Sequence, residues 1–415
     1  MVETKIQRER ALLIGADTGE YDAEASMDEL SELARTAGAE VVATLLQRME
    51  RPNNSTYIGS GKLQEVKETC RQKEIDLLIV DDELTGSQIR NLEEQLQTDV
   101  IDRTMLILDI FAGRARSNEG KLQVELAQQK YLLPRLTGMG NKLSRLGGGI
   151  GTRGPGETKL ESDKRHIRRR IAALEEELRK VKRRRERIRE RRQKNGCPSV
   201  AIVGYTNVGK STLLNRLTNA GVLAKDQLFA TLDPTARELF LPDGQKAVLI
   251  DTVGLLRRLP HQLIQAFRST LEEAANADVI LNLCDISSDE APAQLEVSRR
   301  LLDELSCGCI KTITVYNKVD QAEMLPEISA NDNVAFISAK TGEGLERLLA
   351  LLAKSLSERM AEESYRIPYT DGSTAAAIRR EGKLLAEEYR EDGVFLTVQI
   401  AKKDAARYRS YLVKK

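Results

Sequence analysis

A run of eight residues has the types and spacing of a phosphate-binding loop. It matches the pattern G-x-x-x-x-G-K-[ST] and consists of Gly204, Tyr205, Thr206, Asn207, Val208, Gly209, Lys210 and Ser211. In such a loop the glycines let backbone amides surround phosphates, the lysine adds positive charge, and the hydroxyl binds Mg²⁺. We therefore expect Lys210 to contact the outer phosphates of a nucleotide and Ser211 to ligate Mg²⁺.

A second motif has the form D-x-x-G and consists of Asp251, Thr252, Val253 and Gly254. In phosphoryl-transfer switches an aspartate of this kind holds Mg²⁺, and the glycine amide responds to the γ-phosphate. We expect Asp251 to act on the metal through a water molecule and Gly254 to sense the γ-phosphate.

Two further motifs have the residue types that recognise a guanine base. They are Asn317, Lys318, Val319 and Asp320, and then Ser338, Ala339 and Lys340. The carboxylate of Asp320 can accept both hydrogen bonds from the N1 and N2 edge of guanine, which adenine lacks. Lys318 would lie along the base plane, and the Ala339 amide would cap the base. Each motif follows a predicted strand, and this order predicts a Ras-like domain that binds GTP and GDP.

The segment between the first two motifs is expected to close around bound GTP. Its candidate nucleotide-binding residues are Phe229, Ala230, Thr231, Leu232 and Asp233. Thr231 and Thr235 are both candidates for the second protein ligand of Mg²⁺. We prefer Thr231, because the segment resembles the F-T-T-L-x-P segment of Obg GTPases. Arg237 could reach the phosphates as an arginine finger, but we favour the interpretation that this arginine leads into the next strand.

The residue after Gly254 indicates slow intrinsic hydrolysis. Ras has a water-orienting glutamine there, whereas this chain has Leu255, which cannot position a nucleophile. A partner or a monovalent cation must then assist. Asn207 stands where potassium-activated GTPases have a cation-binding asparagine, so K⁺ is a candidate activator. Lys210, Thr231, Gly254 and Asn207 are thus the residues expected to act in catalysis.

Apolar periodicity predicts the elements that position these motifs. In the GTPase region the predicted strands are 199–203, 248–250, 279–284, 313–316 and 334–337, with a helix over 212–217. Towards the N-terminus, strands at 11–15, 41–46 and 77–80 alternate with helices near 24–37, 60–73 and 86–97. For the C-terminal region we predict a strand near 366–369, a helix near 374–390, a strand at 394–401 and a short helix.

Two patterns in the N-terminal region resemble ligand sites only weakly. The run from Gly59 to Lys62 lacks the spacing and the hydroxyl of a phosphate-binding loop. Asp81, Asp82 and Glu83 follow a strand, and we expect acidic residues there to serve as helix caps and solvated surface.

The middle of the chain predicts a helical hairpin with a basic arm. A helix over 118–133, ended by Pro134, precedes a loop at 137–156 that contains 8 glycines. The next helix repeats apolar residues at coiled-coil spacing. The repeat consists of Ile167, Ile171, Leu174, Leu178, Val181 and Ile188, and Arg185 occupies one apolar position of this seam.

Charge is concentrated in this arm although the whole chain is nearly neutral. The formal net charge is +1, yet residues 164–194 contain 16 Lys and Arg against 5 Glu, a local net of +11. The other 384 residues therefore sum to −10. Such an arm suits RNA phosphates. We expect a cytoplasmic protein without a membrane span, because no stretch is long and apolar enough and the 5 cysteines are too irregular for a disulfide framework.

Together, these features resemble the HflX family, a branch of the Obg-HflX translation-factor GTPases. The most diagnostic stretch is the glycine-rich run at 147–159, beside the nucleotide motifs and the segment 229–235. The resemblance implies a GTPase that binds the ribosome, chiefly the 50S subunit and its RNA. We expect Mg²⁺ as its cofactor and a monomeric protein. It also implies a role in protein synthesis, in ribosome splitting or rescue under stress, or in ribosome biogenesis.

The expected architecture is multidomain α/β. It comprises an α/β N-terminal domain (1–110), the basic hairpin (111–195), a Ras-like GTPase domain (196–360) and a small α+β C-terminal domain (361–415). Two alternatives stay open: an RNA-modification or ribosome-assembly GTPase, and a nucleotide-regulated RNA-binding scaffold with negligible turnover.

Overall fold

The computed structural model describes residues 8–136, 159–194, 197–218, 229, 235–258, 260, 263, 272–322, 333–358 and 360–413. The chain forms two compact units. The first comprises Met1–Val181, Asp226–Asp233 and Leu256–Arg268, and the second comprises Lys182–Lys225, Pro234–Leu255 and Ser269–Lys415. The chain is a multidomain α/β protein, as predicted.

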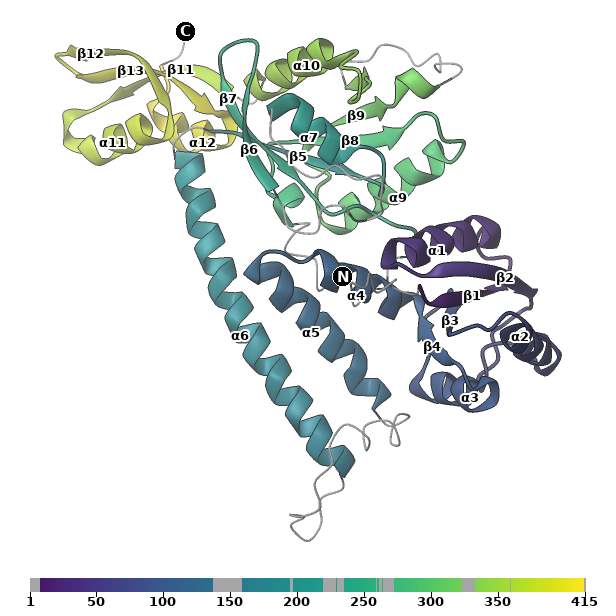
Figure 1. Ribbon diagram of the computed structural model, residues 1–415. Helices are drawn as coiled ribbons and strands as arrows, with labels where there is room; N and C mark the ends of the chain where they lie inside the picture. The colour runs from purple at the N-terminus through teal and green to yellow at the C-terminus, as the bar shows by residue number, and fades with distance from the viewer. Residues whose placement is uncertain are drawn as a thin grey trace, which may run out of the picture. The chain divides into compact units, whose positions relative to one another are not determined.

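A parallel four-stranded sheet with order β2-β1-β3-β4 begins the first unit (Figure 1). Its strands are β1 (Arg10–Asp17), β2 (Glu40–Arg48), β3 (Leu77–Val80) and β4 (Asp99–Asp102). The helices are α1 (Ala23–Ala37), α2 (Ser60–Gln72), α3 (Gly86–Leu96) and α4 (Arg103–Arg114). Sequence periodicity missed β4 and α4. The strand β4 has only four residues, and α4 is buried around most of its circumference and so lacks an amphipathic pattern.

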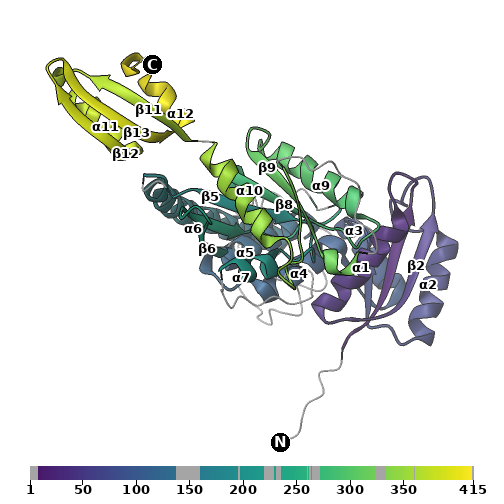
Figure 2. The same cartoon turned by 90° about the horizontal axis from the view of Figure 1, so that it is seen from above.

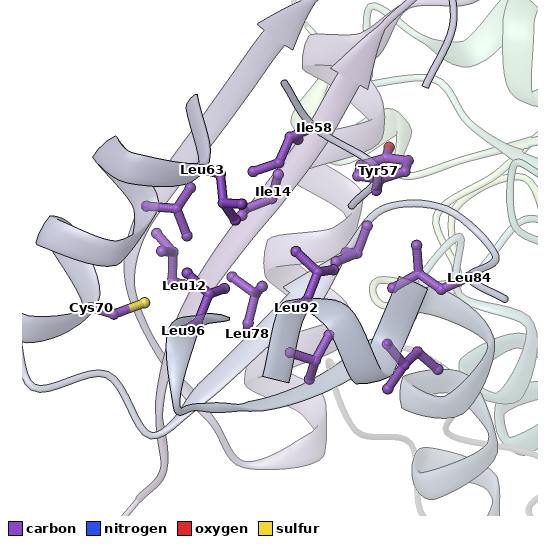
Figure 3. Close-up of a cluster of buried hydrophobic side chains, with 14 of the residues drawn as sticks. Leu12, Ile14, Tyr57, Ile58, Leu63, Cys70, Leu78, Leu84, Leu92 and Leu96 are labelled. Carbon is purple, nitrogen blue, oxygen red and sulfur yellow. The ribbon is translucent and has the colours of Figure 1, made fainter. Parts of the chain in front are cut away.

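The core of this sheet lies between the strands and the helices α2 and α3. Leu12, Ile14 and Leu78 project from the strands toward Leu63 on α2 and toward Leu92 on α3 (Figure 3). Alternate strand residues face one side of a sheet, so this spacing places the apolar side chains together. The helix α1 packs against α4.

The predicted hairpin consists of α5 (Asn118–Arg135) and α6 (Lys159–Lys194), which run side by side (Figure 1). Leu122 and Leu126 of α5 enclose the fully buried Leu174 of α6, and Ile171 and Leu178 pack against this cluster. The helix α5 continues through Pro134 to residue 135, so the predicted end at 133 is wrong by two residues. The glycine-rich loop 137–156 lies outside the described residues.

The second unit contains a six-stranded sheet with order β10-β9-β8-β5-β7-β6, parallel except for β6. Its strands are β5 (Ser199–Gly204), β6 (Thr235–Phe240), β7 (Lys246–Asp251), β8 (Val279–Asp285), β9 (Lys311–Asn317) and β10 (Val334–Phe336). The helices α7 (Lys210–Thr218), α9 (Ala291–Glu304) and α10 (Leu345–Ser357) pack on this sheet (Figure 2). All five strands predicted for this region are present.

A three-stranded antiparallel sheet with order β11-β13-β12 follows. Its elements are β11 (Met360–Ile367), α11 (Gly372–Glu381), β12 (Lys383–Arg390), β13 (Gly393–Ala401), α12 (Lys402–Ala405) and the 3₁₀ turns Tyr369–Asp371 and Ala406–Tyr411. The predicted helix 374–390 is wrong beyond residue 381. The stretch 383–390 has local helix-forming residues, but pairing with β13 makes it an edge strand.

Among the described helices, none has an apolar stretch long enough to cross a lipid bilayer.

Candidate functional site

The nucleotide motifs follow the carboxyl ends of parallel strands in one sheet. The strand β5 ends at Gly204 and β7 at Asp251, while β9 ends at Asn317. Because β5 lies between β8 and β7, and β9 pairs with β8, these ends lie along one edge of the sheet. Loops at this edge form the usual ligand crevice of open α/β sheets.

Asn317 connects three of the motif loops. Its Nδ2 donates to the Val208 carbonyl at 2.7 Å, and its Oδ1 accepts from the Ala339 amide at 2.9 Å. Gly209 has a φ of +93°, and any β-carbon there would collide with the Asn317 side chain. Glycine at 209 is thus required both by the backbone conformation and by this close approach.

Lys210 begins α7 and is buried, with 7% of its surface exposed. Its Nζ donates to the carbonyls of Gly204 at 3.0 Å and Tyr205 at 2.5 Å. Burial lowers the pKa of the Lys210 amine to about 8, and the negative charge of Asp251 opposes this shift. The amine therefore lies inside the loop, where it could meet a phosphate.

Ser211 and Asp251 provide oxygen donors suited to Mg²⁺. The Ser211 hydroxyl donates to Asp251 Oδ2 at 2.8 Å, and both side chains are buried. Hard oxygen donors fit Mg²⁺, which also takes phosphate oxygens and water as ligands. Within the described ranges, no group of three or more His, Cys, Asp or Glu side chains could hold a metal ion.

Internal contacts fix the D-x-x-G loop against β5 and the phosphate-binding loop. The Thr252 hydroxyl donates to the Ile202 carbonyl at 2.7 Å, and Val253 is buried. The Leu255 amide donates to the Gly204 carbonyl at 3.1 Å, and the Thr206 amide donates to the Leu255 carbonyl at 2.9 Å. Gly254 is held between these contacts.

The candidate base-binding residues differ in exposure. Lys318 adopts a left-handed backbone conformation, and its Nζ pairs with Asp285 at 2.5 Å. Asp320 is exposed in the 3₁₀ turn Val319–Gln321. Ser338 is buried and accepts from the Thr341 amide at 3.0 Å, which shapes the loop of Ala339. Lys340 is exposed.

The segment expected to close over GTP is described only in part. Phe229 belongs to the first unit, where its ring packs edge-on against Phe111 with centroids 4.5 Å apart. Residues 230–234, including Thr231, lie outside the described residues. Thr235 begins β6 opposite Asp251, and Arg237 lies within β6 opposite Leu249.

A buried ion-pair cluster in the first unit was not foreseen. We name it the Arg258 cluster: Glu29, Asp81, Asp82, Arg103 and Arg258. Asp81 is 1% exposed, pairs with Arg103 at 2.6 Å and accepts from Arg258 at 3.2 Å. Arg258 also pairs with Asp82 at 2.9 Å, and Arg103 pairs with Glu29. Burial raises the pKa of the Asp81 carboxyl, and Arg103 opposes that rise.

The expectation that Asp81 is a cap or a solvated residue is therefore wrong. Thr85 caps α3 instead, through the Gln88 amide. The only signal in the sequence was the pair of arginines at 257 and 258, close behind the D-x-x-G motif. Arg103 also donates to the Arg257 carbonyl at 3.2 Å, so the cluster holds the backbone of this segment.

The run from Gly59 to Lys62 is part of the start of α2. The Gly59 amide donates to Gln47 at 3.1 Å, and Lys62 pairs with Glu65 at 3.0 Å. These contacts are those of an ordinary helix start.

Comparison with known proteins matches the chain to three family descriptions. Residues 24–112 match "GTP-binding GTPase N-terminal", and residues 114–192 match "GTP-binding GTPase Middle Region". Residues 199–318 match "50S ribosome-binding GTPase". Similar solved structures include a GTP-binding protein of Sulfolobus solfataricus in complex with GDP. It shares 27% identity over 84% of this chain and 99% of its own, with a TM-score of 0.45.

Curated relatives named GTPase HflX match over nearly the whole chain. That of Caldanaerobacter subterraneus subsp. tengcongensis is 49% identical over 100% of this chain and 96% of its own. That of Lacrimispora saccharolytica is 51% identical over 96% of this chain and 95% of its own. That of Escherichia coli is 41% identical over 88% of this chain and 87% of its own. Since these identities extend through the described nucleotide motifs, the chain belongs to the HflX family of GTPases and hydrolyses GTP.

Proposed function

We propose that this GTPase associates with the ribosome, chiefly with its large subunit, and that bound GTP favours the associated state. The observation that carries the proposal is the positive charge of α6, a net of +11 over residues 164–194. The printed family description "50S ribosome-binding GTPase" for residues 199–318 points to the same partner. A ribosomal partner in turn implies a cytoplasmic location.

Some basic side chains of α6 pair with the GTPase domain, and others are exposed. Lys182 pairs with Glu272 at 3.1 Å and Arg185 with Glu273 at 3.4 Å, so these two also contact the GTPase domain. Arg183 and Arg184, between them, are exposed. Exposed arginines can neutralise RNA phosphates and release counterions. Because the arm has few aromatic residues, we propose recognition of RNA backbone and shape rather than of base sequence.

The nucleotide roles follow from the motif geometry. In the proposed complex, Lys210 and the amides of residues 204–211 bind phosphates, and Gly254 responds to the γ-phosphate. Asp320, Lys318 and Ala339 bind the guanine base. The support is the convergence of these loops at one sheet edge, held together by Asn317.

Magnesium would be held by Ser211 and Thr231, with Asp251 acting through water. It would neutralise negative charge on the nucleotide phosphates. The support within the described residues is the buried Ser211–Asp251 contact of 2.8 Å.

The proposed cycle is a two-state switch. GTP orders the segments around Thr231 and after Asp251 and so favours ribosome binding, and hydrolysis releases the protein. We assign this switch a role in protein synthesis, in the splitting or rescue of ribosomes under stress, or in ribosome biogenesis.

The test is sedimentation of ribosomal subunits with the protein and a non-hydrolysable GTP analogue. We expect co-sedimentation with 50S subunits that is strong with the analogue and weak with GDP. The variant Arg183→Glu/Arg184→Glu should lose this co-sedimentation with 50S subunits. Arg185 is left unchanged because its contact with Glu273 makes it structural as well.

The matched control is Arg299→Glu/Arg300→Glu, the same charge reversal at two exposed positions of α9. This control should sediment like the unmodified protein. If the α6 variant still sediments with 50S subunits, the basic arm is not the contact. If neither nucleotide supports binding to 50S subunits, the ribosomal proposal fails.

A further inference from the structure

The side-chain hydroxyl of Thr206 has no assigned role, although Thr206 is the third residue of the phosphate-binding loop. Thr206 is 5% exposed, and its Oγ1 has no hydrogen-bond partner among the residues that the structure describes. A buried, unpaired hydroxyl costs about 1–3 kcal/mol. Such groups in a native protein require an explanation, and a functional one is common near active sites.

Thr206 lies where the proposed catalytic groups converge. A β-carbon added to Gly254 would lie 2.6 Å from Thr206 Cγ2 and 3.2 Å from Lys210 Nζ. The Thr206 side chain, the lysine amine and the D-x-x-G glycine are therefore close neighbours. If the loop binds GTP as proposed above, the γ-phosphate lies between this lysine and this glycine.

The position that carries the glutamine in Ras cannot help here. Leu255 has no polar side-chain group and is 2% exposed. Its amide donates to Gly204 at 3.1 Å, and its carbonyl accepts from the Thr206 amide at 2.9 Å. These two bonds pin Leu255 to the phosphate-binding loop, directly beside Thr206.

We infer that Thr206 is a catalytic residue whose hydroxyl orients the attacking water against the γ-phosphate. A hydroxyl can accept one hydrogen bond from water and donate another to a phosphate oxygen, as a glutamine amide can. Threonine is stiff about χ1, which limits the entropy lost in holding that geometry. This inference rests on the proposed nucleotide site.

The reaction balances without any change to the threonine. The water oxygen forms a bond to the γ-phosphorus while the bond from that phosphorus to the β–γ bridging oxygen breaks. GDP leaves with the electron pair, and the proton of the water passes to the phosphate product. The Thr206 hydroxyl keeps its own proton and serves only to orient the water.

The experiment compares Thr206→Val, which removes the hydroxyl but keeps the shape, with Thr206→Ser, which keeps the hydroxyl. Single-turnover hydrolysis of bound GTP gives the chemical rate, and titration with fluorescent GDP and with a GTP analogue gives the affinities. We expect Thr206→Val to slow hydrolysis about 10- to 100-fold, with both affinities within about threefold of the unmodified protein. Thr206→Ser should retain most of the rate.

Thr312→Val, a partly buried threonine in β9, controls for the substitution itself and should hydrolyse GTP normally. A Thr206→Val protein that hydrolyses GTP at the normal rate overturns the inference. So does a Thr206→Ser protein as slow as Thr206→Val, because the side-chain shape would then be what matters. Failure of the nucleotide site itself is separate: it appears as unchanged GDP affinity in Lys210→Ala.

Discussion

At the scale of single residues, the position of Lys210 has a measurable consequence. A lysine whose charge is disfavoured by burial loses its proton far below its ordinary pKa, and that of Lys210 is lowered to about 8. A bound phosphate would favour the charged amine and raise this pKa again. Nucleotide binding should therefore be linked to uptake of a proton above pH 8.

We expect GDP binding at pH 8.5 to take up most of one proton, and binding at pH 6.5 to take up almost none. The measurement is calorimetry in two buffers with different ionisation enthalpies. Lys210→Arg stays charged throughout, because arginine is effectively never deprotonated. It should lack the difference between the two pH values. Equal proton uptake in the two proteins at pH 8.5 would show that Lys210 is not the linked group.

The second residue prediction concerns Asn207, which is exposed and has a left-handed φ of +62°. Asparagine tolerates this conformation better than most residues, and its amide oxygen is a suitable ligand for a monovalent cation. We expect GTP hydrolysis to be several-fold faster in K⁺ than in Na⁺, and Asn207→Ala to lose this difference. Equal rates in the two salts would contradict a potassium role.

At the scale of elements, the contact between α5 and α6 depends on one buried leucine. Leu174 is fully buried between Leu122 and Leu126, whereas Ile188, on the same helix, is 43% exposed. We predict that Leu174→Ala lowers the free energy of unfolding by about 2–5 kcal/mol, because it leaves a cavity. Ile188→Ala is the matched control and should cost about 0.5 kcal/mol or less. Denaturant unfolding followed by circular dichroism measures both, and equal losses would contradict this packing.

The helix α6 also explains an irregularity in its own sequence. Arg185 interrupts the apolar spacing, and in the structure it faces Glu273 at 3.4 Å. An apolar residue there would leave that glutamate without this partner. The interruption therefore coincides with the change from contacts with α5 to contacts with residues 272 and 273.

At the scale of the whole chain, the Arg258 cluster joins residues that are 177 positions apart. Arg258 lies four residues after Gly254, so Asp81 and Asp82, which directly follow β3, hold the segment after the D-x-x-G motif. Removing one partner from a buried ion pair leaves an uncompensated charge. We predict that Asp81→Asn destabilises the protein by about 3–5 kcal/mol.

Asp82→Asn is the control for this prediction, because Asp82 is the neighbouring residue and its pair with Arg258 is partly exposed. It should cost less than about 1 kcal/mol. Thermal unfolding at constant pH measures both variants. A double variant, Asp81→Asn/Arg258→Met, should recover part of the loss if the two residues act as a pair. No recovery would mean that Asp81 acts mainly through Arg103.

The sequence by itself determined the family, the nucleotide class and most of the strands and helices. These depend on consecutive residues, since a phosphate-binding loop, a D-x-x-G motif or an apolar strand is complete within a few positions. The positive charge of α6 could likewise be counted directly from its Lys, Arg and Glu residues. For the same reason the sequence could name Lys210, Asp251 and Asp320 but not say which groups would be buried beside them.

Tertiary structure decided whatever depends on residues far apart in the chain. It turned the predicted helical stretch 383–390 into the strand β12, since hydrogen bonds to β13 outweigh local propensity. It buried Asp81, which local pattern places at the surface, because Arg103 and Arg258 meet it there. It also placed the Thr206 side chain beside Gly254. Burial and charge pairing are properties of the assembled fold, and no local pattern of residues encodes them.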